Sequence, residues 1–174
     1  MKKIKHQSLE GSVDFLGYQF NIYCLLESER TIARKVIIDL SENKKKRFQT
    51  RVILSALQFR KDGNFKNFYD RIRVLSGNYN IYDMDRNIRR NVGIYYNYRF
   101  IKIKESIHLN ELDFFLKSLF LSKTGKLGVI FAKLSQDQRK KLLSLSFLRS
   151  FTTGAFSHFK SSHLSDLVRC WAYE

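Results

Sequence analysis

Residues Val13–Tyr23 read VDFLGYQFNIY, a stretch dense in aromatic and β-branched side chains. Such side chains fit the pleated, half-buried surface of a sheet, and the turn formers Ser8, Glu10 and Gly11 come just before them. A second β-rich run, Thr31–Leu40, follows, and we expect it to return antiparallel to the first. The first forty residues therefore predict a short antiparallel β element.

The pattern becomes helical at Ser41, a good N-cap residue, with Glu42 placed to favour the helix dipole. Apolar residues then recur at three- and four-residue spacing to about residue 60, and Gly63 suits the helix end. A second helix is expected over Phe65–Leu75, and the residues Ser76–Asn80 should break it. We therefore predict two successive helices after the β element.

The remaining chain is expected to be mainly helical. The stretch Asp85–Phe100 is ambiguous, whereas the last seventy residues carry helical spacing throughout. Ser135 and Gln138 form a capping-box pattern that should open a helix over Asp137–Leu148. The predicted class is α+β, a short N-terminal antiparallel β-hairpin element followed by a mainly α-helical bundle. We divide it into residues 1–40, 41–104 and 105–174.

Composition limits the functional classes. The 174 residues hold 32 Lys and Arg against 16 Asp and Glu, a net charge of +16, and 14% of them are aromatic. A balance so basic points to a polyanion, and aromatic side chains among the cations suit nucleic acid, whose bases stack on them. The two cysteines, Cys24 and Cys170, are too few for a disulfide scaffold or a four-cysteine zinc site. No apolar run approaches the ~18 residues of a membrane helix, and no secretory signal is visible. We expect a cytoplasmic protein without a membrane partner.

The positive charge is concentrated in the middle of the chain. Residues 1–29 have a net charge of −1, residues 30–104 of +13 and residues 105–174 of +4. The middle block includes the run Lys44, Lys45, Lys46 and Arg47, with Arg51 one turn further on. A helix carrying this run would lie along a phosphate backbone, or the run would simply form a solvated helix face.

One string in the β element carries a family resemblance. The string Phe15–Tyr18 (FLGY), followed by a β-rich stretch and a Ser-capped, Lys-rich helix, resembles the palm-to-thumb transition of bacterial reverse transcriptases. Three further segments are similar to the C-terminal parts of defence-associated reverse transcriptases of the groups called "unknown": Arg71–Asn78, Arg89–Tyr98 and Ser157–Glu174. The resemblance implies that residues 1–40 end the palm with the primer grip. It also implies that residues 41–104 form a basic thumb and residues 105–174 a helical extension.

The resemblance also implies what this chain lacks. The family's polymerase aspartates, which hold two Mg²⁺ ions, lie upstream of the FLGY string, and this chain has no Asp-Asp pair. Tyr82–Asp85 (YDMD) imitates the family's metal-binding turn but lies far downstream, where a polar loop with a helix cap is the expected role. We therefore assign no catalytic residue, no metal ligand and no bound cofactor to this chain, and we expect it not to polymerise alone.

The candidate nucleic-acid contacts come from three places. The resemblance assigns Phe15, Leu16, Gly17 and Tyr18 to the primer grip, with Phe15 and Gly17 expected on one face of a strand and Leu16 and Tyr18 on the other. The helix after Ser41 contributes Lys44, Lys45, Lys46, Arg47 and Arg51. Arg89 and Arg90 lie beside Tyr95, Tyr96 and Tyr98, which are either stacking platforms or half-buried packing residues.

Two functions remain open from the sequence. The first is the nucleic-acid-binding C-terminal part of a reverse transcriptase, an RNA-directed DNA polymerase, of the antiviral-defence type. It would bind RNA or an RNA/DNA hybrid beside a separate chain that carries the palm. The second is a stand-alone RNA-binding or interaction module without polymerase function.

Overall fold

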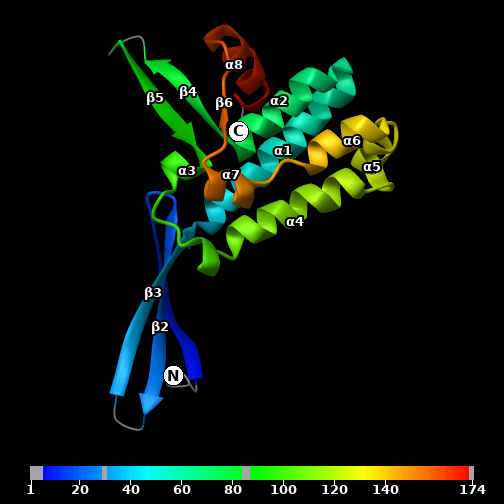
Figure 1. Cartoon of the computed structure of the whole chain (residues 1–174). Coiled ribbons are helices and arrows are strands. Elements are labelled where there is room, and N and C mark those ends of the chain that lie inside the picture. The colour runs from blue at the N-terminus through cyan, green and yellow to red at the C-terminus, as the bar shows by residue number, and fades with distance from the viewer. Residues whose placement is uncertain (1–5, 29–30, 84–86, 173–174) are drawn as a thin grey trace.

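The computed structural model describes residues 6–28, 31–83 and 87–172. Its fold is α+β, which confirms the predicted class. The strands are β1 (His6–Phe15), β2 (Tyr18–Ser28), β3 (Thr31–Leu40), β4 (Asn78–Asp83), β5 (Ile88–Gly93) and β6 (Phe156–Ser157). The helices are α1 (Glu42–Asp62), α2 (Phe65–Ser76), α3 (Ile94–Asn97), α4 (His108–Leu121), α5 (Gly125–Ala132), α6 (Gln136–Leu143), α7 (Phe147–Thr153) and α8 (Ser161–Val168). In Figure 1 the β1–β3 sheet projects from one end of the helical body, and the β4–β5 hairpin projects in another direction.

The N-terminal element is a three-stranded antiparallel sheet in the order β1-β2-β3. Leu16 and Gly17 make the turn between β1 and β2, with φ angles of 50° and 87°. Two successive positive φ values are typical of the type I′ turn, whose twist matches that of the flanking strands. Phe15 therefore pairs directly with Tyr18 across the hairpin and shares its face. The expectation that Phe15 shares a face with Gly17 was wrong, because it treated two strands as one.

The polar residues before this hairpin also belong to the sheet. We expected turn formers at Ser8, Glu10 and Gly11, but all three lie within β1. The pairing register with β2 shifts between Leu9 and Gly11, so that Glu10 is accommodated in a β-bulge, whereas Ser8 and Gly11 pair with Cys24 and Ile22.

One face of this sheet is apolar and open. The register aligns Val13 with Phe20 and Ile38 in one row across the three strands, and Gly11 with Ile22 and Val36 in the next. We call this surface the open sheet face and define it by its apolar residues, Val13, Phe15, Phe20, Ile22, Val36 and Ile38. Val13, Phe15 and Val36 are exposed, and the other three side chains are half-buried.

The two predicted helices are confirmed as α1 and α2. The Ser41 hydroxyl accepts a hydrogen bond from the backbone N–H of Lys44 at 3.3 Å, as an N-cap does. Gly63 ends α1 in the left-handed conformation, with φ 63°. Asn64 then caps α2 by accepting from the N–H of Asn67 at 3.0 Å.

The β4–β5 hairpin was not predicted. It occupies the stretch in which we expected a helix break and an ambiguous segment, and the two residues of β6 pair with β4 in parallel. Asn78 explains the placement, because this buried side chain bonds three backbone groups: its Nδ2 donates to the carbonyls of Ser150 and Ala155, and its Oδ1 accepts from the N–H of Tyr95. The hairpin is therefore fixed by contacts that lie 17 to 77 residues away along the chain.

The C-terminal part is helical as predicted, with one boundary corrected. Ser135 and Gln138 form the expected capping box, but α6 ends at Leu143. Ser146 starts a new helix, α7, by accepting from the N–H of Arg149 at 2.9 Å, and the Asp113 carboxylate accepts from the N–H of Phe147 at 2.6 Å. The predicted helix over Asp137–Leu148 is thus two helices.

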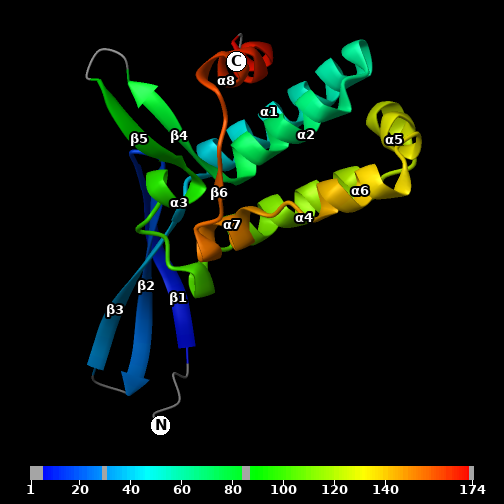
Figure 2. The same cartoon turned by 45° about the horizontal axis from the view of Figure 1, so that its top comes forward.

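One core joins both halves of the helical body. Figure 2 shows α1 and α2 as one pair, with α4, α6 and α7 alongside them. The largest fully buried side chains come from α2, α4, α5 and α7, and include Phe68, Phe120, Phe131 and Phe147. No helix within residues 6–28, 31–83 and 87–172 is both long and apolar enough to cross a bilayer.

A buried carboxylate joins the sheet to the helices. Asp39, near the end of β3, is only 2% exposed. Its Oδ1 accepts from the Ser106 hydroxyl at 2.6 Å, and its Oδ2 accepts from the backbone N–H groups of Ile107 and His108 at 2.7 and 3.1 Å. Because the first N–H groups of a helix have no partner within the helix, this carboxylate caps α4 from another element.

Replacement of Asp39 by Ala tests this junction. We expect the free energy of unfolding to fall by about 3 kcal/mol, because four buried or half-buried donors, one of them the N–H of Leu40, lose a charged acceptor. Urea denaturation followed by far-ultraviolet circular dichroism measures the change. The matched control is Asp14→Ala, an exposed carboxylate on β1, which should change stability by less than about 0.5 kcal/mol. Equal losses in the two variants would contradict the role of Asp39.

Candidate nucleic-acid interface

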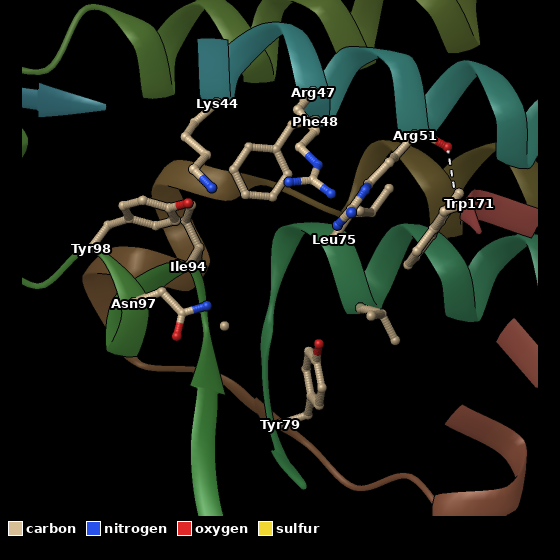
Figure 3. A pocket seen from close by; sticks show the side chains of 12 residues that line it. Lys44, Arg47, Phe48, Arg51, Leu75, Tyr79, Ile94, Asn97, Tyr98 and Trp171 are labelled. Carbon is tan, nitrogen blue, oxygen red and sulfur yellow. Dashed lines mark hydrogen bonds between the residues drawn. The ribbon is translucent and has the colours of Figure 1, made fainter. Parts of the chain in front are cut away.

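A cleft of about 220 Å³ lies between α1 on one side and the β4–β5–α3 segment on the other. Lys44, Arg47 and Arg51 extend from α1 toward it, as Figure 3 shows. The opposite side carries Tyr79, Asn97 and Tyr98, and the remaining lining is largely apolar: Phe48, Val74, Leu75, Gly93, Ile94 and Trp171. No Asp or Glu is among these lining residues. The cleft therefore combines positive charge with aromatic and apolar surface.

The three cations follow one face of α1. Their spacing of three and four residues places them side by side along the helix. From Lys44 to Arg51 is seven residues, which is roughly 10 Å along the axis at ~1.5 Å per residue. The Arg51 guanidinium lies 5.5 Å from the centre of the Trp171 ring. The helix thus presents a short, ordered row of positive charge to the cleft.

The predicted basic run does not act as one unit. Lys45 turns away from the cleft, and its Nζ lies 2.8 Å from a carboxylate oxygen of Glu42 and 2.5 Å from one of Glu111. Burial works to lower the pKa of Lys45, but the two carboxylates outweigh it, so that this pKa lies above its ordinary value. Lys46 has a side chain that is 68% exposed and lies 3.9 Å from Glu42. Lys44 and Arg47 line the cleft, whereas Lys45 joins α1 to α4 and Lys46 faces solvent.

The FLGY turn meets α1 at the mouth of the cleft. The carbonyl of Gly17 accepts from the N–H of Ser41 at 2.9 Å. A Cβ on Gly17 would lie 2.9 Å from Cε of Lys44 and 3.4 Å from a ring carbon of Tyr98. The missing side chain therefore leaves room for Lys44 to lie across the turn.

Tyr18 links the same turn to the opposite wall. Its hydroxyl donates to the carbonyl of Asn97 at 3.0 Å, and its ring meets Tyr98 edge to face at 5.7 Å. Burial raises the pKa of both tyrosines above the ordinary value, which favours the neutral phenol. Phe15 and Leu16 point elsewhere: they are 62% and 79% exposed and do not line the cleft. None of the four FLGY residues lines the cleft, but Gly17 and Tyr18 contact residues that do.

Arg89 and Arg90 lie on opposite faces of the β4–β5 hairpin. Arg90 pairs with Ile81, two residues from Tyr79, so that it shares the face of the hairpin that carries Tyr79. Arg89 lies on the other face and lines a separate cavity with His158 and neighbouring residues. Of this predicted pair, only Arg90 is on the side of the cleft.

Both walls of the cleft are held by buried polar contacts. The Trp171 indole N–H bonds the carbonyl of Arg51 at 3.1 Å and the Ser55 hydroxyl at 3.0 Å, which fixes the α1 wall. The opposite wall depends on the Asn78 contacts and on Gly93. A Cβ added at Gly93 would lie 2.4 Å from the carbonyl oxygen of Gly77, so only glycine fits there. These contacts, all within this chain, shape the cleft.

Sequence reasoning missed most of the lining residues, including two polar ones on the wall opposite α1. Tyr79 and Asn97 had no distinguishing pattern, because the strand and the short helix that carry them were not predicted. Of the tyrosines considered as stacking platforms, Tyr98 is buried in the cleft wall, whereas Tyr95 and Tyr96 are exposed. The cluster of tyrosines near Arg89 and Arg90 was the available signal, and it did not show which of the three lies in the cleft.

The described residues offer no metal site. Within the described ranges, no group of three or more His, Cys, Asp or Glu side chains could hold a metal ion. Tyr82 and Asp83 are the last residues of strand β4, so this part of the expected polar loop is strand instead. Asp85 lies outside the described residues. The two Mg²⁺ ions implied by the family resemblance therefore find no fitting donor set in the described residues.

Comparisons with known proteins give no further assignment: no family model, no curated protein and no solved structure matches this chain.

Replacement of Gly17 by Ala tests the contact between turn and helix. We expect a loss of about 1 kcal/mol in the free energy of unfolding, because alanine is strained at φ 87° and its Cβ meets Lys44. Gly11→Ala is the matched control, since no atom lies within 4 Å of the added Cβ and Gly11 has no positive φ. Chemical denaturation of both variants gives the comparison, and a smaller loss for Gly17→Ala than for Gly11→Ala would contradict the assignment.

Proposed function

We propose that this chain binds nucleic acid through the cleft between α1 and the β4–β5–α3 segment. The observation that carries the proposal is the row of Lys44, Arg47 and Arg51 opposite aromatic residues, with no carboxylate in the lining. Each cation that meets a phosphate releases condensed counterions, which supplies sequence-independent affinity. The +13 charge of residues 30–104 adds a long-range attraction for polyanions.

The wider proposal is that the chain is the thumb-like, C-terminal part of a cytoplasmic reverse transcriptase of the antiviral-defence type. RNA-directed DNA synthesis would then need a separate chain that contributes the palm, its aspartates and Mg²⁺, with RNA or an RNA/DNA hybrid as the bound nucleic acid. The open sheet face supports such a partner. A sheet of three strands must bury its apolar face against another layer, and Val13, Phe15 and Val36 are exposed here.

The alternative is a stand-alone RNA-binding module. One observation favours it: both walls of the cleft, and the buried Trp171 and Asn78 contacts that hold them, come from this chain. Nucleic-acid binding alone thus needs no palm, whereas the proposed polymerisation does. The two functions differ in whether a second chain must cover the open sheet face.

Removing the cationic row tests nucleic-acid binding. We expect the variant Lys44→Gln, Arg47→Gln, Arg51→Gln to bind RNA more weakly than the native chain. The slope of log K against log salt should also become shallower by two to three, because each lost phosphate contact removes about 0.7–0.9 from it. Fluorescence anisotropy at four or more salt concentrations measures both quantities.

The control removes the same charge elsewhere. Lys117, Lys140 and Lys141 are exposed on α4 and α6 and do not line the cleft. Their joint replacement by Gln should leave the slope within about 0.5 of the native value. Equal slope changes in the two triple variants would mean that binding is diffuse, and the cleft would lose its assigned role.

Amide hydrogen exchange separates the two functions. If the open sheet face awaits a partner chain, amides across Val13–Tyr23 should exchange much faster in the isolated chain than those of α1, because a sheet without a second layer opens locally. Exchange across the sheet as slow as that of α1 would show that the sheet is stable alone. That result would favour the stand-alone module.

A further inference from the structure

The cleft is a narrow recess, and its shape limits what can enter it. We propose that it receives a single unpaired nucleotide of a nucleic-acid strand, with the phosphates on the α1 cations and the base in the recess. The chain would then prefer single strands to duplex. This inference rests on the proposed function and names the form of nucleic acid that the cleft binds.

The volume sets the first limit. About 220 Å³ is below the roughly 300–1,000 Å³ of ordinary ligand pockets. A space of this size suits one flat ring system better than a base pair.

The cationic side fits a backbone that enters the recess. Lys44, Arg47 and Arg51 reach inward from α1 in Figure 3, so that their charges line the recess rather than a convex ridge. The row spans roughly 10 Å, the reach of two or three successive phosphates at ~3.4 Å or more per nucleotide. A strand that follows α1 can therefore keep its phosphates on the row while one base turns inward.

The rest of the lining suits a base. Half-buried Phe48 gives the recess an apolar side, and Leu75, Ile94 and Tyr98 lie behind it with at most 8% of their surface exposed. Asn97 offers amide donors and an acceptor, the groups that hydrogen-bond the edges of unpaired bases in RNA recognition. Phosphate contact alone would not require this apolar, aromatic and amide surface behind the cations.

A duplex cannot use this surface without losing a base pair. Its bases are stacked inside the helix, so a duplex laid against α1 presents only phosphates, and the recess stays unfilled. Extrusion of a paired base costs unstacking and unpairing free energy, whereas an unpaired base has little to lose. The recess is also formed in advance, since Trp171 and Asn78 hold its two walls, and this lowers the cost of ordering on binding.

The test uses the full chain and three labelled RNA ligands of equal length in nucleotides: a single strand, a blunt hairpin duplex, and a single strand with abasic sites throughout. We expect the single strand to bind at least about tenfold more tightly than either of the others at the same salt concentration. The abasic ligand separates the base contribution from the phosphate contribution, because it keeps every phosphate.

A variant that fills the recess links the preference to the cleft. Asn97 is exposed on α3, so that Asn97→Trp should fold and place a ring in the recess. We expect it to reduce the preference for the single strand over the abasic ligand to less than about twofold. Asn110→Trp, on the exposed face of α4 and outside the cleft, is the control and should keep the tenfold preference.

The outcomes distinguish this inference from the proposed function. If duplex binds as tightly as the single strand and the cationic triple variant still lowers the salt slope, the unpaired-nucleotide inference is overturned and nucleic-acid binding stands. A preference for the single strand that persists in Asn97→Trp would also overturn it, because the base would lie elsewhere. Absence of binding to all three ligands would overturn both.

Discussion

The buried carboxylate of Asp39 determines how the two parts of this molecule are joined. It lies two residues before the N-cap of α1 and bonds the first turn of α4, so that β3, α1 and α4 meet around one charged group. A buried charge is tolerated only where several donors satisfy it, and here a hydroxyl and two helix N–H groups do so. The directions of the sheet and of both helices are therefore set at a single junction.

The cleft depends on this junction. Because α1 leaves β3 in a fixed direction, its first two turns pass beside the FLGY turn, and the carbonyl of Gly17 meets the N–H of Ser41. Tyr18, the next residue, hydrogen-bonds the carbonyl of Asn97 and packs edge to face on Tyr98 in the opposite wall. A sheet that looks like a separate projection in Figure 1 thus positions one end of the cationic row.

Local signals in the sequence predicted much of the fold, and long-range contacts account for what they missed. Ser41, Gly63 and the Ser135–Gln138 pair act within one helical turn of their own position, so that sequence patterns could identify them. The β4–β5 hairpin depends on Asn78 and its distant partners, which no local pattern encodes. The same holds for the site. The basic run predicted Lys44 and Arg47, but the sequence could not show that Lys45 bonds Glu111, which lies 66 residues away and on another helix.

Leu16 lowers the stability of the free chain in two ways. It occupies a left-handed turn position with φ 50°, where asparagine is favoured before glycine, and most of its apolar side chain faces water. An Asn-Gly turn would relieve both the backbone strain and the apolar exposure without altering the strand pairing. The isolated protein is therefore not at its stability optimum at this turn, and a surface that covered Leu16 would recover part of the loss as binding free energy.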